Sequence, residues 1–211
     1  MSQIKERVSA ALYTPNHLEA LTDAVFAIVM TLLVLEISIP EIAQSSLQAE
    51  LPRRLIELWP KLYSYVLSFI VLGLLWSLHH ISFHYIKRSN IVLVWLNIIF
   101  LMFVALIPFS TSLIGNYGTE QLSLVIYASN ILFAAVVRII IWAYATGKYR
   151  LVDSDINPRW VKFTMLRGMG ICLSLMLVIG ITFINVTAAF SVLVLLLVAG
   201  IAMQFIARRL E

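Results

Sequence analysis

The chain has 211 residues, of which 61% are hydrophobic and only 12% are charged, and its formal net charge is +4. A water-soluble domain carries about 25% charged residues, so this composition excludes a soluble globular protein and indicates a surface that faces lipid. The basic residues lie between apolar stretches, which does not favour nucleic-acid binding, and the single cysteine, Cys172, excludes an intrachain disulfide.

Six stretches are long and apolar enough to cross a bilayer, since a transmembrane helix needs about 20 mostly apolar residues. The sequence therefore predicts an all-α membrane protein with one six-helix domain over residues 1–211. The residues before the first span lack the order of a cleaved signal peptide, so we expect that span to be retained. The expected spans are 17–39, which stops at Pro40, then 58–86, 90–115, 120–146, 161–184 and 187–205.

The distribution of basic residues predicts the orientation, because loops on the cytoplasmic side carry an excess of Lys and Arg. With the N-terminus inside, only three basic residues lie outside: Arg53, Arg54 and Lys61. Both termini are therefore expected in the cytoplasm, as an even number of spans requires. The inner side then holds ten basic residues: Lys5, Arg7, Lys87, Arg88, Lys148, Arg150, Arg159, Lys162, Arg208 and Arg209.

The first span carries an aliphatic stripe. On a helical wheel with about 100° per residue, Thr31, Leu32 and Leu35 fall within about 60° of Ile28. Asp23 lies about 140° from Ile28 on the same wheel, and Glu36 lies near the expected outer end. A carboxylate inside a membrane requires a partner, so Asp23 is expected to be buried among other helices and hydrogen-bonded, with His79 and Asn97 as its neighbours. Ordinary helix packing also explains such a stripe.

The second span ends with three histidines. His80 and His84 are four residues apart, which is a spacing of metal ligands, but no cysteine or nearby carboxylate completes a site and no metal is expected. Hydrogen bonding to a buried acid and a position at the membrane interface are the other interpretations of these histidines. Asn97 is a further polar residue inside a span, and Arg138 is expected either to reach the interface or to pair with a carboxylate.

The segment from His17 to Ile28 resembles the first-helix signature of the transmembrane protein 175 family of potassium channels. That signature reads Arg, three residues, then Phe-Ser-Asp. Asp23 matches it, whereas His17, Leu21 and Thr22 stand in place of the arginine, phenylalanine and serine. The likeness continues over about the first 115 residues, through Thr31-Leu32-Leu33-Val34-Leu35-Glu36-Ile37, Trp76, His79-His80, Trp95-Leu96-Asn97 and Pro108-Phe109-Ser110-Thr111.

The resemblance implies a potassium-permeable leak channel in which four copies of a single-repeat chain surround a pore lined by the first helix. It places the narrowest ring at Ile28, supported by Leu32 and Leu35, and links Thr31 to selectivity. Glu36 would lie at the outer mouth. The resemblance also implies a structural hydrogen-bond network of six residues: His17, Thr22, Asp23, Trp76, His79 and Asn97.

The expected function is thus a weakly selective potassium channel with a hydrophobic constriction instead of a carbonyl filter. It would be a homotetramer in a prokaryotic plasma membrane, with lipid and potassium ions as partners and no cofactor. The alternative is a small proton-coupled transporter that uses Asp23 and His79, although such transporters usually show paired repeats or broken helices. An intramembrane enzyme built on Asp23 and the histidines lacks a nucleophile beside a base.

Overall fold

The computed structural model describes residues 14–38, 42, 44 and 47–207, and the regular elements in this part of the chain are helices. Six helical segments in it are long and apolar enough to cross a membrane, which confirms the predicted fold class. The elements are, in chain order, α2 (Pro15–Leu32), η1 (Leu33–Glu36), α3 (Leu47–Glu57), α4 (Trp59–His84), α5 (Ile91–Ala105), α6 (Ile107–Tyr117), α7 (Gln121–Thr146), η2 (Gly147–Tyr149), α8 (Pro158–Thr182) and α9 (Val186–Ala207).

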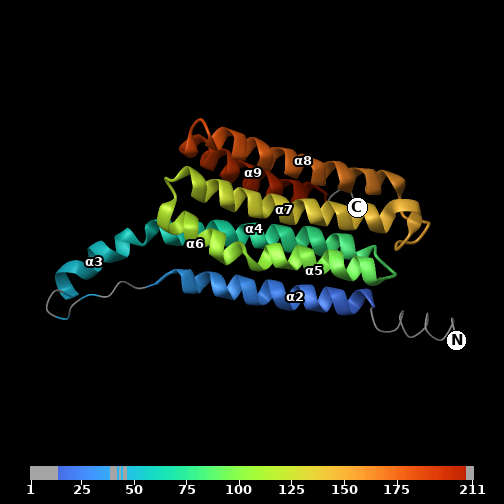
Figure 1. Ribbon diagram of the computed structural model, residues 1–211, viewed down its shortest axis with the longest axis horizontal. Coiled ribbons are helices and arrows are strands. Elements are labelled where there is room, and N and C mark those ends of the chain that lie inside the picture. Colours follow the sequence, from blue (N-terminus) through green and yellow to red (C-terminus); the bar gives the residue numbers. More distant parts are fainter. Residues whose placement is uncertain (1–13, 39–41, 43, 45–46, 208–211) are drawn as a thin grey trace.

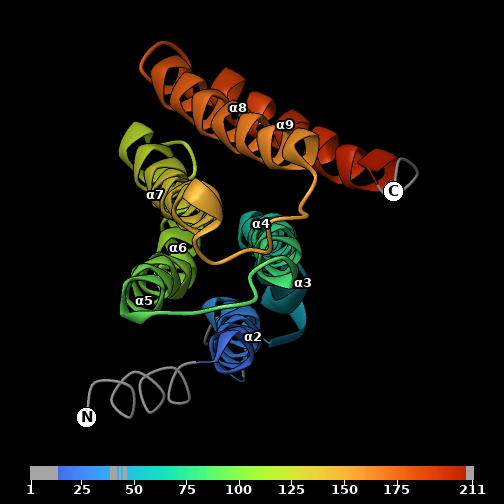
Figure 2. The ribbon, with the colours of Figure 1, turned by 90° about the vertical axis from the view of Figure 1, so that its right-hand side faces the viewer.

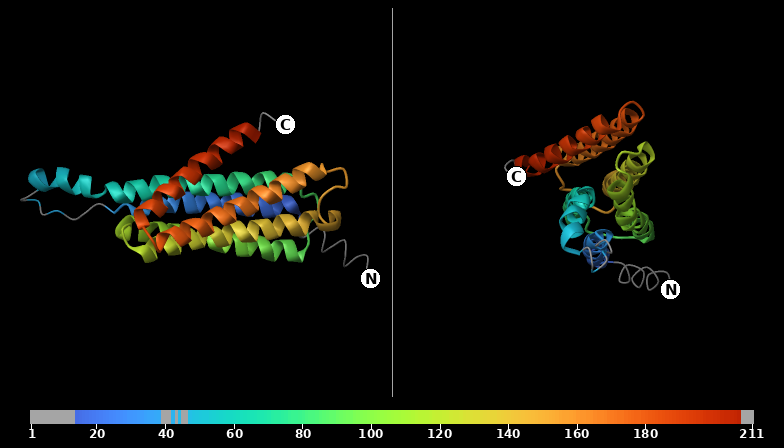
Figure 3. Two further views of the ribbon diagram at one scale, coloured as in Figure 1. Left: turned by 90° about the horizontal axis from the view of Figure 1, so that it is seen from above. Right: turned by 90° about the vertical axis from the view of Figure 1, so that its left-hand side faces the viewer.

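The long helices run roughly along one axis (Figure 1), with α4, α5, α6 and α7 in the middle of the bundle. α2 lies at one edge against α4 and α5, and the pair α8 and α9 lies at the opposite edge (Figure 2). α9 crosses the bundle obliquely (Figure 3). The first helix is therefore covered by its own chain on one side only.

α2 begins at a proline and buries one stripe. Pro15 occupies the first turn, where its missing N–H costs no helix hydrogen bond. The buried side chains follow at steps of three and four, which is the helical period: Leu18, Thr22, Phe26, Val29 and Leu33. The sequence predicted one helix to residue 39, but the α-helix ends at Leu32 and tightens into the 3₁₀ helix η1. Residues 39–41, with Pro40, lie outside the described residues.

The third predicted span consists of two helices. α5 ends at Ala105 and α6 begins at Ile107, close to Pro108. A proline ring inside a helix removes a backbone hydrogen bond and clashes with the carbonyl four residues earlier, which accounts for the break. Two loops meet at the other end of α5: the backbone N–H groups of Lys87 and Arg88 donate to Leu151 O at 2.9 and 3.2 Å.

Candidate functional site

The face of α2 that points away from the bundle is apolar and exposed. Ile28 is 59% exposed, Leu32 43% and Leu35 71%, and Thr31 is exposed beside them. Leu35 lies in η1, where three residues make one turn, so it stands above Leu32. These side chains form a continuous strip that no part of the described chain covers. We call this strip of Ile28, Thr31, Leu32 and Leu35 the α2 strip.

The hydroxyl hydrogen of Thr31 is taken up by a hydrogen bond within its own helix. Its hydroxyl donates to Ile28 O at 2.7 Å. The hydroxyl oxygen therefore keeps acceptor lone pairs on an exposed surface that is otherwise aliphatic. Glu36, at the end of η1, is half-buried next to this strip.

A buried polar group connects α2, α4 and α5. His79 Nε2 lies 2.9 Å from Asn97 Oδ1, and Asn97 Nδ2 donates to Thr22 Oγ1 at 3.1 Å. All three residues are almost fully buried. The imidazole of His79 also stacks between Phe83 and Phe100, with ring centroids 4.2 and 4.8 Å away. These hydrogen bonds connect one residue of each of the three helices inside the bundle.

Asp23 does not join that group, contrary to our expectation that it would be buried near His79 and Asn97. It is exposed on the surface of the chain and accepts a hydrogen bond of 2.7 Å from Trp76 Nε1. One turn away, Glu19 Oε1 lies 2.9 Å from His80 Nδ1, and Trp76 stacks on His80 with 5.4 Å between the rings.

Glu19 and His80 were missed as partners by sequence reasoning, although a signal existed. Glu19 and Asp23 are four residues apart on α2, and Trp76 and His80 are four apart on α4. Two such pairs on antiparallel helices meet rung by rung. The expected network is therefore two separate sets of contacts between α2 and its neighbours: the buried group around Asn97 and the exposed pairs with Trp76 and His80. His17 belongs to neither: it is exposed, and no side-chain hydrogen bond joins it to a described residue.

A second buried polar cluster lies between α4, α6 and α7. Thr111 Oγ1 donates to Ser68 Oγ at 2.7 Å, and Ser68 Oγ lies 3.0 Å from the hydroxyl of Tyr127. Thr111 was expected only as part of the family likeness, whereas Ser68 and Tyr127 were missed. Single hydroxyl groups in separate spans carry no periodic signal, so only the packing of the helices brings them together.

Arg138 was expected either to reach the membrane interface or to pair with a carboxylate, and the structure supports neither expectation. It is only 3% exposed, and no acidic side chain of the described residues forms an ion pair with it. Among the same residues, no three His, Cys, Asp or Glu side chains are grouped closely enough to hold a metal ion.

Comparisons with known proteins agree with this arrangement. Residues 17–108 match the family model described as the endosomal/lysosomal potassium channel TMEM175. A potassium channel of Streptomyces collinus is 31% identical over 179 residues, which cover 81% of this chain and 83% of that protein. The mouse endosomal/lysosomal proton channel TMEM175 is 32% identical over 152 residues, which cover 66% of this chain and 30% of that protein.

The fold is also that of a solved channel. The crystal structure of a lysosomal potassium-selective channel TMEM175 homolog from Chamaesiphon minutus superposes with a TM-score of 0.79 and 26% identity. The superposition covers 90% of this chain and 97% of that one. The similarity to the Streptomyces protein extends over most of both chains. This chain therefore belongs to the TMEM175 family of potassium channels.

Proposed function

We propose that four copies of this chain form a weakly selective potassium channel whose pore is lined by α2. The observation that carries the proposal is the α2 strip, which is aliphatic and exposed while the opposite face of the same helix is buried. One edge helix cannot enclose a pore alone, whereas four symmetry-related copies around an axis can. The potassium channels among the relatives support the permeant ion, and their names describe channels and not enzymes.

The strip determines how such a pore would restrict ions. Rings of Ile28 and Leu32 lie about one α-helical turn apart, and Leu35 adds a further ~6 Å of 3₁₀ rise. Aliphatic rings offer no ligands in place of hydration water, so they limit passage by width and dewetting. Thr31 would present its hydroxyl oxygens to the dehydrating ion, and Glu36 would raise the cation concentration at the outer mouth.

The proposed orientation has both termini in the cytoplasm of a prokaryotic cell and the channel in its plasma membrane. In support, the loops that carry Lys87, Arg88, Lys148 and Arg150 pack on one another at one end of the bundle: Arg88 donates to Val152 O at 2.6 Å and to Tyr149 O at 3.2 Å. Single cysteines at Ser154 and Thr119, both exposed in loops at opposite ends, test this. We expect only the Thr119 cysteine to react with an impermeant reagent added outside.

The decisive experiment replaces Ile28 by Asn and measures current and reversal potential under potassium, sodium and proton gradients. A wetted ring should pass more current and discriminate less between potassium and sodium. Leu173→Asn is the matched control, because Leu173 is 62% exposed on α8. The constriction lies elsewhere if Ile28→Asn assembles normally and leaves both quantities unchanged.

Two further measurements bear on the rest of the proposal. Mass determination in lipid nanodiscs should give four chains, and a monomer or dimer would contradict the pore as described. Passive potassium flux in liposomes without a coupling gradient supports a channel. Potassium movement that occurs only with proton movement would instead favour the transporter that uses Asp23 and His79.

A further inference from the structure

A cavity of about 500 Å³ opens between α4, α7, α8 and α9, on the side of the bundle opposite α2. Its walls are mostly apolar, with side chains such as Leu78, Ile131 and Leu197. Among the described residues that line it, Arg167 is the one with a charged side chain. We call this cavity the α8 groove. A cation in an otherwise aliphatic groove at lipid depth requires an anion or water.

A second arginine lies behind Arg167. The Nη2 atom of Arg138 lies 3.1 Å from the point that a Cβ on Gly168 would occupy, so its guanidinium packs directly on α8. Its Nε atom is buried and has no hydrogen-bond partner within the described chain. No carboxylate of the described residues forms an ion pair with either arginine. Arg138 thus packs on α8 at the residue that follows Arg167, and two cations in the same low-dielectric region with no paired carboxylate attract an anion.

Two more buried donors lie toward the same end of these helices. Trp160 Nε1 and Gln204 Nε2 are buried without partners among the described residues. The centroid of the Trp160 ring lies 5.8 Å from that of Phe163, which lines the groove, and Gln204 directly follows Met203, which also lines it. These two atoms and Arg138 Nε are all donors, so a group that satisfies them is an acceptor.

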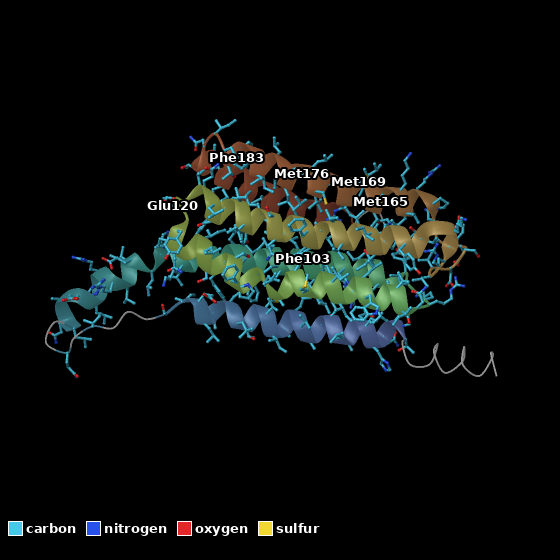
Figure 4. All side chains as sticks on the ribbon, viewed as in Figure 1. Phe103, Glu120, Met165, Met169, Met176 and Phe183 are labelled. Atoms are coloured by element: carbon cyan, nitrogen blue, oxygen red, sulfur yellow. The ribbon has the colours of Figure 1, made fainter. Side chains whose placement is uncertain are left out.

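The outer face of this part of the chain is apolar and exposed, as a surface that faces lipid is. Met169, Met176 and Phe183 are spaced by seven residues along α8 (Figure 4), are 49%, 49% and 69% exposed, and do not line the groove. α8 thus stands at the boundary of the chain, with apolar surface on its outer face and the groove on another. The acyl chain of a lipid would pack against the apolar walls, and its anionic head group would pair with the arginine charge.

We propose that the α8 groove binds one anionic phospholipid, with an acyl chain along the apolar walls and the phosphate at Arg167, while the charge of the buried Arg138 adds to the attraction from behind. Charge complementarity selects this occupant: a zwitterionic lipid adds a third cation next to the two arginines, and an apolar helix brings no acceptor. The proposed orientation of the termini places the site in the cytoplasmic leaflet. The binding itself does not depend on ion conduction, so it is tested separately from the channel.

The test is native mass spectrometry of the purified full-length protein with equal amounts of phosphatidylglycerol and phosphatidylcholine. We expect wild type to retain phosphatidylglycerol, and Arg167→Gln to lower that retention about tenfold, as loss of one charge-assisted contact predicts. Arg159→Gln is the matched control, since Arg159 is exposed on the same helix and does not line the groove. If Arg167→Gln and Arg159→Gln lower phosphatidylglycerol retention equally, the effect is one of overall charge and the proposed site is wrong.

A second pair of variants removes the acyl site without touching a charge. Gly170 lines the groove and has no atom within 4 Å of its would-be Cβ, so Gly170→Leu fills the groove without a clash at that position. Gly180 is equally open but lies outside the groove. Gly170→Leu should lower phosphatidylglycerol retention, whereas Gly180→Leu should not. If Gly170→Leu folds and retains the lipid at the wild-type level, the groove is not the site.

Two probes identify the source of the anion. Inorganic phosphate alone should not compete with phosphatidylglycerol, because it leaves the aliphatic walls unoccupied. If phosphate at equal concentration does compete, the groove binds anions in general, and the proposal of a phospholipid site is wrong. Retention of oleate in preference to phosphatidylglycerol would likewise overturn it in favour of a fatty acid.

Discussion

The imidazole of His79 and the side-chain amide of Asn97 meet at 2.9 Å, and the two residues are 1% and 0% exposed. Because the Asn97 Oδ1 atom only accepts, the hydrogen of His79 lies on Nε2. The other end of the same amide donates to Thr22 on α2. One asparagine therefore connects the proposed pore helix to α4 and α5.

Replacing Asn97 by Leu should destabilise the protein by about 1–2 kcal/mol, because it leaves the His79 donor buried without an acceptor. Thr22 keeps its bond to Leu18 O at 2.9 Å. Thermal unfolding in detergent measures the effect. Asn116→Leu is the control, since Asn116 is exposed and bonds only within its own helix.

Adding His79→Phe to Asn97→Leu should recover part of that loss, because both polar partners are then replaced. If the double variant loses as much stability as the two single variants, Asn97→Leu and His79→Phe, lose together, this account of the pair is contradicted.

The contact between Asp23 and Trp76 should appear as an interaction energy. Trp76→Phe keeps a ring to stack on His80 but removes the donor to Asp23, and Asp23→Asn weakens the acceptor. In a double-mutant cycle of thermal stability we expect the two changes to be coupled by about 0.5–3 kcal/mol. Purely additive effects would show that the 2.7 Å contact contributes nothing to how α2 is held.

The hydroxyl of Thr31 should govern potassium against sodium discrimination. Thr31→Val keeps the shape and removes the hydroxyl oxygen, so the reversal potential under opposed potassium and sodium gradients should move toward that of a non-selective pore. Thr31→Ser keeps the oxygen and should stay close to wild type. An unchanged reversal potential in Thr31→Val, with normal assembly, would remove this residue from selectivity.

Two glycines of α8 should respond in opposite directions to alanine. A Cβ on Gly168 would lie 2.7 Å from Ile139 Cγ1, which is closer than packed atoms allow, so Gly168→Ala should destabilise by about 1–3 kcal/mol. Gly180 has no atom within 4 Å of its would-be Cβ, so Gly180→Ala should be neutral or stabilise by up to ~1 kcal/mol. The midpoint of thermal unfolding separates them, and equal shifts would contradict the close packing of α7 on α8.

Sequence by itself determined the six spans and the candidate pore face. The cost of polar groups in lipid forces long apolar runs into helices, and the period of a helix is local, so the stripe of Ile28, Leu32 and Leu35 can be predicted from spacing alone. Even the break at Pro108 has a local cause, although its consequence for α5 and α6 was not predicted.

Only the tertiary structure decided which polar groups meet. Asp23 was expected beside His79 and Asn97, yet the neighbouring Thr22 occupies that place and Asp23 bonds to Trp76. A shift of one residue on a helix turns a side chain by about 100°, so partners across helices depend on the rotation and register of whole helices. The same holds for Arg138, which reaches α8 next to Arg167 because α7 packs on α8 at Gly168, and no pattern within either span predicts that contact.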